Sequence, residues 1–178
     1  AAPQRVLSLT SIMSSSGAKG LPQATPDVTR VLLKQPASDA PEDVVNHYVR
    51  LFKAIGSPGY PVAEPEMRER ILLGVHRSFH PVGTLRQMLA IVGDTTRAVQ
   101  LSRITSPTLV LHGRADPLVP FPNGEDTAQR IPGARLVGFD GMGHDLPPEL
   151  VSLMLDELIP HLQASAPPAP YLAAKTKA

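Results

Sequence analysis

The sequence predicts an α/β protein in which a parallel sheet is flanked by helices and interrupted by a long helical insertion. Three short stretches, 6–12, 108–111 and 135–139, are rich in apolar and β-branched residues, as strands are. Helical periodicity fills the segments after the second and third stretches. Strands that alternate with helices of this length are typical of right-handed crossovers and a parallel sheet.

The first strand is followed by about four successive helices, with no strand among them. The clearest begins at Pro41, a residue suited to a first helical turn, and ends before a Gly-Ser-Pro-Gly turn. Its apolar residues fall on one face: Val44, Tyr48, Leu51, Phe52 and Ile55. The expected helices cover 41–55, 64–79, 83–92, 95–101, 123–131 and 148–162, with 28–34 as either loop or one short helix. Pro160 is expected to weaken the last turn of the final helix.

Composition limits the classes of function. With 178 residues, 42% hydrophobic and 19% charged, the chain is long enough for one ordered core. A net charge of +1 is not the excess of positive charge that binding to nucleic acid or to an anionic membrane surface would require. The absence of cysteine excludes disulfides, thiolate metal sites and a cysteine nucleophile. We expect no cofactor, no metal, no nucleic-acid partner and no membrane partner.

The two ends of the sequence carry further expectations. The first residues show neither an initiator Met nor a signal-peptide layout, so the chain is expected to start in the middle of a longer protein. No apolar run reaches the roughly 18 residues of a membrane span. The compartment stays open, with the cytoplasm favoured. The Pro- and Ala-rich tail, 164–178, is expected to be disordered.

Two turns carry the residues most suited to catalysis. Asp116 lies five residues after Leu111, and His144 lies five residues after Phe139. Sites in parallel sheets assemble beyond the carboxyl ends of strands, so both side chains are expected at one edge of the sheet. An Asp there can accept the Nδ1–H of a His and stabilise the imidazolium that forms during proton transfer. Taken singly, each is more often structural, because Asp-Pro is a common turn; their joint occurrence favours catalysis.

Other histidines give weaker signals. His76 and His80 have the i,i+4 spacing of a metal pair, but Arg77 stands where a zinc protease would need Glu, so surface or cap positions are expected. His47 and His161 are interpreted as solvated helix positions. For His112, packing is favoured over support of a neighbouring site residue.

Residues 107–162 resemble the C-terminal part of the α/β-hydrolase superfamily, whose triad runs in the order nucleophile, acid, histidine. The segment Leu-Val-Leu-His-Gly-Arg-Ala-Asp, ending at Asp116, resembles that family's seventh strand and acid turn. Gly-Met-Gly-His, ending at His144, resembles its histidine turn, and 5–12 its sixth strand. Residues 116–120 and 141–147 are also similar to the methylesterase-like branch that includes aclacinomycin methylesterase.

The resemblance implies a division of the chain. Residues 1–17 correspond to a core strand and loop, 18–104 to the helical cap and 105–163 to the C-terminal part of the core. The family's first five strands, oxyanion loop and Gly-x-Ser-x-Gly elbow are not among these residues. Ser14, Ser15 and Ser16 lack the strained elbow that exposes a nucleophile, and a loop near the site is expected for them.

The function implied is a serine carboxylic-ester hydrolase for a small or mid-sized apolar ester. Asp116 and His144 would supply the acid and the base, and the nucleophile would come from a missing N-terminal half or a companion chain. An aspartate nucleophile would instead indicate a dehalogenase or epoxide hydrolase. The alternative is a non-catalytic, truncated domain that binds a ligand or a partner subunit.

Two further expectations follow for the cap and the sheet. The apolar stripes of the cap are expected to be core first of all, and only secondarily would Met67, Leu72 or Met88 line a substrate pocket. The first strand is expected to leave an open apolar edge, so the isolated chain should fold poorly without a partner that supplies more strands.

Overall fold

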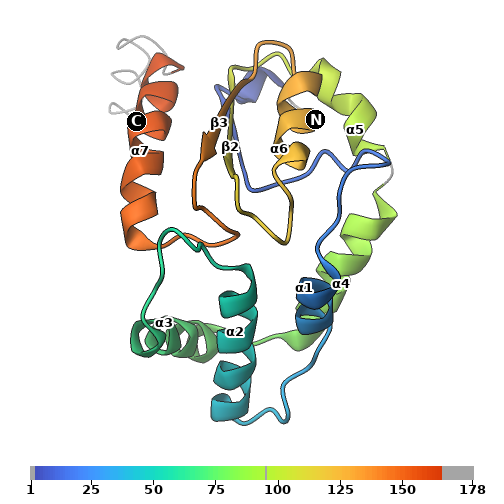
Figure 1. Cartoon of the computed structure of the whole chain (residues 1–178). Helices are drawn as coiled ribbons and strands as arrows, with labels where there is room; N and C mark the ends of the chain where they lie inside the picture. The colour runs from blue at the N-terminus through green and yellow to red at the C-terminus, as the bar shows by residue number, and fades with distance from the viewer. Residues whose placement is uncertain (1–2, 95, 166–178) are drawn as a thin grey trace, which may run out of the picture.

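A three-stranded parallel sheet forms the centre of the protein. A computed structural model describes residues 3–94 and 96–165 (Figure 1). Its strands are β1 (Leu9–Ile12), β2 (Thr108–Gly113) and β3 (Arg135–Phe139), in the order β1-β2-β3. All six residues of β2 are buried, as expected of the middle strand of a parallel sheet. Within the described residues β1 pairs only with β2, so its other edge is free there.

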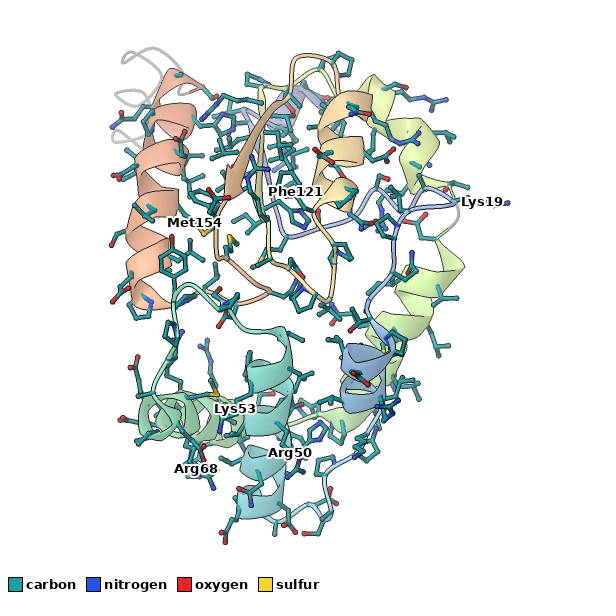
Figure 2. The ribbon with its side chains drawn as sticks, viewed as in Figure 1. Lys19, Arg50, Lys53, Arg68, Phe121 and Met154 are labelled. Carbon is teal, nitrogen blue, oxygen red and sulfur yellow. The ribbon has the colours of Figure 1, made fainter. Side chains whose placement is uncertain are left out.

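Two helices cover opposite faces of this sheet. The helices α6 (Pro122–Arg130) and α7 (Pro148–Ala164) lie on either side of the strands in Figure 1. Met154 points from α7 towards the sheet (Figure 2). The main core cluster consists of Leu109, Leu111, Met142, Leu150 and Met154. Burial of such side chains stabilises the fold by about 1.5–3 kcal/mol each.

Most of the helical segment between β1 and β2 lies beyond the carboxyl ends of the strands, and its last helix returns alongside the sheet (Figure 1). Its elements are α1 (Pro26–Leu32), α2 (Pro41–Ile55), α3 (Glu64–Arg77), α4 (Pro81–Gly93), α5 (Arg97–Gln100) and a 3₁₀ turn (Leu101–Arg103). A further 3₁₀ turn, Pro3–Arg5, precedes β1. Proline occupies one of the first two positions of α1, α2, α3 and α4, where its missing N–H costs no hydrogen bond. The α/β fold class expected from the sequence is therefore confirmed.

The packing of α2 corrects the expected single apolar face. Its buried residues are Val44, Val45, His47, Val49 and Ile55. This stripe is wider than one heptad face because α1 and α3 both pack against α2. His47 is only 6% exposed, so its interpretation as a solvated position was wrong. A second cluster, with Val45, Val49 and Ile71 at its centre, joins α2 to α3.

The helix α4 also departs from expectation. Its apolar residues were expected to be buried, but Leu85, Leu89 and Val92 are more than half exposed. The reason is that α4 packs closely against none of the other described elements. None of the helices in residues 3–94 and 96–165 is long and apolar enough to cross a membrane.

The final helix runs through Pro160 and ends at Ala164, two residues beyond the expected end. Pro160 removes one backbone donor without stopping the helix. The expected disordered tail begins at this last helical residue, and 166–178 lie outside the described residues.

We expect His47 to make the stability of the fold depend on pH. Burial, aided by repulsion from Arg50, lowers the pKa of His47 below 6.5. The folded state then binds fewer protons than the unfolded state, so stability is full above about pH 6.5 and falls as the pH drops below it, by at most about 1.4 kcal/mol per pH unit. Urea unfolding at pH 7.5 and 5.5 measures this loss.

The variant H47Q should reduce that loss. The matched control is H76Q, which removes an exposed histidine of α3 and should leave the loss as it is. An identical pH dependence in wild type and H47Q would contradict the assignment to His47.

Candidate active site

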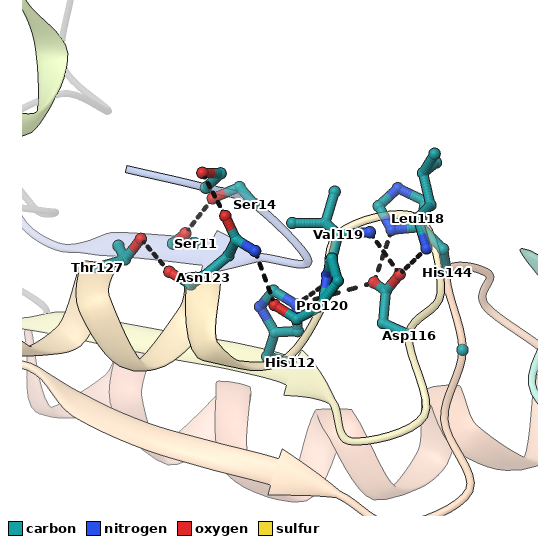
Figure 3. A network of polar contacts seen from close by, with 12 residues as sticks. Ser11, Ser14, His112, Asp116, Leu118, Val119, Pro120, Asn123, Thr127 and His144 are labelled. Carbon is teal, nitrogen blue, oxygen red and sulfur yellow. Dashed lines mark hydrogen bonds and ion pairs between the residues drawn. The ribbon is translucent and has the colours of Figure 1, made fainter. Parts of the chain in front are cut away.

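The turn after β2 holds Asp116 in a fixed orientation. The carboxylate oxygen Oδ1 accepts the backbone N–H groups of Leu118 (2.9 Å) and Val119 (2.8 Å), as Figure 3 shows. The side chain of Asp116 is fully buried. A buried carboxylate is costly unless hydrogen-bond donors surround it, and this turn supplies two from its own backbone.

The turn after β3 places His144 beside that carboxylate. Gly141 has a φ of +71°, which L side chains rarely adopt, and it redirects the chain as β3 ends. At Gly143 a Cβ atom would lie 2.3 Å from the carbonyl oxygen of Gly56, so the turn can approach the end of α2 only with glycine here. The backbone N–H of His144 donates to the carbonyl of Ile55 at 2.7 Å.

Asp116 and His144 form a direct hydrogen bond. The His144 Nδ1 atom lies 2.7 Å from Asp116 Oδ2, and Nδ1 donates because an ionised carboxylate can only accept. The side chain of His144 is 24% exposed, so it connects the buried acid to the site surface. Among the described residues no partner hydrogen-bonds its Nε2, which leaves that nitrogen available as a base. The sequence placed these two side chains at one sheet edge, and the structure brings them into contact.

His112 supports the turn that carries Asp116, whereas the sequence favoured packing instead. Its ring is fully buried at the end of β2, with Nε2 donating to the carbonyl of Val119 at 2.8 Å. The same nitrogen lies 3.8 Å from Asp116 Oδ2 (Figure 3). Phe121 packs edge-on against the ring, with 5.9 Å between centroids. His112 therefore packs in the core and also holds the acid turn.

Ser57 links the end of α2 to the histidine turn, and no sequence pattern indicated this. Its hydroxyl donates to Asp145 Oδ1 at 2.5 Å and accepts the backbone N–H of Gly143 at 2.9 Å. These partners are 88 and 86 residues away in the sequence, so no local signal could have found them.

An apolar cavity of about 610 Å³ opens beside His144. This volume is within the 300–1,000 Å³ range of small-molecule sites. Its walls come from α2, α3, the segments that follow these two helices, and the loops that follow β1 and β3. They are formed by Met13, Tyr48, Phe52, Val62, Met67, Arg70, Ile71, Gly74, Val75, Ser78, Phe79, His144, Asp145 and Leu146.

The cavity includes one of the three expected pocket residues. Met67, Ile71 and Val75 recur every four residues and so share the face of α3 that lines it. Leu72 lies off that face, is 38% exposed and lines a separate, shallow pocket. Met88 is on α4 and does not line the cavity. The structure thus contradicts the expectation for Leu72 and Met88, because their helix faces point elsewhere.

Comparisons with known proteins identify a family and relatives that are similar to this chain. The TAP-like protein family matches residues 90–152, which include both Asp116 and His144. Rhodomycin D methylesterase DnrP of Streptomyces peucetius is 33% identical over 117 residues, 65% of this chain and 39% of that protein. Rhodomycin D methylesterase DauP of Streptomyces sp. is 34% identical over 118 residues, 66% of this chain and 39% of that protein.

Solved structures share the same fold. A mutant of the meta-cleavage product hydrolase CumD from Pseudomonas fluorescens superposes with a TM-score of 0.62 at 17% identity, over 93% of this chain and 60% of that one. The esterase RhEst1 from Rhodococcus sp. gives a TM-score of 0.63 at 16% identity, over 90% and 57%. The fold and the sequence matches are those of the α/β-hydrolase superfamily. The aligned part spans about two fifths of the methylesterases that it matches.

None of the three serines that follow β1 hydrogen-bonds to His144 in the described structure. Ser14 bonds to Ser11, Ser15 donates to Asn123 Oδ1 at 2.7 Å, and the buried Ser16 donates to Asp126. The Arg130 guanidinium holds the pKa of the Asp126 carboxyl below its usual value, and the Ser16 hydroxyl adds to this against the effect of burial. Ser15 and Ser16 therefore attach the loop to α6.

The remaining histidines are structural or exposed. The expectation for His161 was wrong, because it is half-buried and its Nε2 donates to the carbonyl of Leu9 at 3.1 Å. His76 and His80 are exposed, near the end of α3 and the start of α4. In the described part of the chain no group of three or more His, Asp or Glu side chains is placed to hold a metal ion.

We expect H112L to destabilise the fold by about 1–3 kcal/mol, because the carbonyl of Val119 would lose the donor that the fully buried His112 ring supplies. Urea unfolding measures this change. H112Q retains a donor and should recover part of the loss. The control H76L alters an exposed histidine and should have little effect. Equal stability of H112L and wild type would contradict the role assigned to His112.

Proposed function

We propose that this chain supplies the acid and the general base of a carboxylic-ester hydrolase, with residues 18–104 as its cap. The observation that carries the proposal is the 2.7 Å hydrogen bond from His144 to the buried Asp116, at the wall of an apolar cavity. In this arrangement Asp116 fixes the tautomer of His144 and stabilises its cationic form, while Nε2 exchanges protons with the reacting groups.

The proposed reaction is an acyl transfer through a serine. His144 Nε2 takes the serine hydroxyl proton as the oxygen attacks the ester carbonyl, and the C–O bond to the alcohol then breaks as Nε2–H protonates the departing oxygen. Water repeats the cycle and releases the carboxylic acid. Asp116 remains ionised throughout. An aspartate in place of the serine would redirect the reaction to a dehalogenase or epoxide hydrolase.

The proposed source of the serine is a segment that pairs with the free edge of β1. In a parallel sheet, a strand added there would end at the same edge as β2 and β3, where Asp116 and His144 lie. Such a segment would be the N-terminal half of a longer protein or a companion chain. The serines after β1 are poor candidates, since their hydroxyls already bond to other residues.

The proposed substrate is an ester with an apolar body. The cavity walls include Met67, Phe52 and Val75, which favour apolar groups by the hydrophobic effect. The relatives named as methylesterases support an ester as the reacting group. Met67 is the one residue of the three expected from sequence that we retain in the substrate site.

Complementation tests this proposal. The chain alone, incubated with p-nitrophenyl acetate and a fluorophosphonate probe, should give neither turnover nor labelling. Mixed or fused with the polypeptide that completes the sheet, it should hydrolyse the ester, and the probe should label a serine of the added segment. Labelling of the chain alone that survives alanine at Ser14, Ser15 and Ser16 but fails in H144A would refute the missing-nucleophile proposal.

In the active assembly, H144A should lower kcat by at least about a thousandfold, and D116N by up to about ten-thousandfold, as in other nucleophile–His–acid triads. D140N is the matched control for D116N, because Asp140 is a 94% exposed acid at the end of β3. H76A serves the same purpose for H144A. An assembly that folds and binds esters, yet turns over equally with and without His144, would favour a non-catalytic ligand-binding domain.

A further inference from the structure

One charged side chain in the cavity wall remains without a partner that neutralises it. Arg70 is the only lysine or arginine among the described lining residues, and it lies on the same face of α3 as Met67 and Ile71. Its guanidinium carries five N–H donors. The single hydrogen bond that it makes among the described residues is a long one, 3.4 Å, to the backbone carbonyl of Leu146.

Six of the other eleven arginines pair with carboxylates: Arg30, Arg68, Arg97, Arg114, Arg130 and Arg135. The remaining five resemble Arg70 in forming no ion pair among the described residues, but they do not line the cavity: Arg5, Arg50, Arg77, Arg86 and Arg103. Arg70 forms no ion pair with any carboxylate in the described part of the chain. Arg68, only two residues away, already pairs with Glu64 and donates to Asn46. Arg70 therefore keeps most of its donors for a ligand.

The one carboxylate in the cavity wall does not compete for this role. Asp145 accepts the Ser57 hydroxyl at 2.5 Å, and Ser57 in turn holds the Gly143 N–H of the histidine turn. Asp145 thus holds, through Ser57, the backbone turn that carries His144. The wall combines an apolar surface with one free cation and a proton-transfer group, His144.

We infer that the substrate is an ester whose apolar body also carries a carboxylate, which Arg70 binds while the ester group reacts at His144. Arginine binds carboxylates through two parallel N–H···O bonds, and Arg70 is exposed at the cavity wall, where a ligand can reach its guanidinium. Arg70 would be a specificity-determining residue that acts on binding. This inference deepens the proposed ester-hydrolase function and rests on it.

A binding experiment tests the inference without requiring turnover. The probes are 2-naphthylacetate, an anion, and 2-naphthylacetamide, its neutral counterpart of the same shape, titrated calorimetrically into the folded protein with any segment that complementation requires. The anion should bind at least about tenfold more tightly to wild type. R70Q should abolish this preference and leave the amide affinity unchanged, and R70K should retain part of it.

R77Q is the matched control, because Arg77 is an exposed arginine of the same helix that does not line the cavity. It should preserve the preference for the anion. Equal affinities of the two probes for wild type, loss of both probes in a folded R70Q, or failure of both to bind would overturn the inference. Ester hydrolysis with no preference for anions would overturn this inference alone, while selective binding without hydrolysis would count only against the proposed function.

Discussion

The hydrogen bond between Asp116 and His144 is the interaction on which the arrangement of the site depends. A buried carboxylate without donors would be strongly unfavourable, and Asp116 satisfies its two oxygens from three sources: two backbone N–H groups and one imidazole. Bonds to charged groups contribute about 1.5–3 kcal/mol each. The bond to His144 exists only when the turns after β2 and β3 are both in place, so the pairing of these strands and the geometry of the site stabilise each other.

The helical segment takes part in the same arrangement. The carbonyl of Ile55 and the hydroxyl of Ser57, at the end of α2, accept backbone N–H groups of the histidine turn. Any shift of α2 would therefore move His144 relative to Asp116. The same helix contributes Tyr48 and Phe52 to the cavity wall, so substrate contacts and the position of the base share one element. This coupling gives the helices a structural role in the site in addition to enclosing it.

Local physical chemistry explains how much of the fold was predictable. Proline at the helix starts, the Gly-Ser-Pro-Gly stop and the buried β2 sequence located most elements to within a few residues. Side-chain environment was less predictable. His47 and His161 are polar residues within helices, for which exposure is the ordinary expectation, yet neighbouring elements bury one and bind the other. Conversely, the apolar residues of α4 have helical spacing but are mostly exposed, because α4 packs closely against none of the other described elements.

The sequence by itself determined the parallel α/β fold and the two turns that carry Asp116 and His144, because strand alternation, glycine and proline act over a few residues. Only the tertiary structure decided what supports and surrounds that pair. The ring of His112 on the acid turn, the Ser57 link and the free guanidinium of Arg70 in the cavity all depend on which chain segments pack together. The Ser57 and Arg70 contacts join residues that are 76 to 88 positions apart in the sequence. No short-range sequence pattern could therefore predict them.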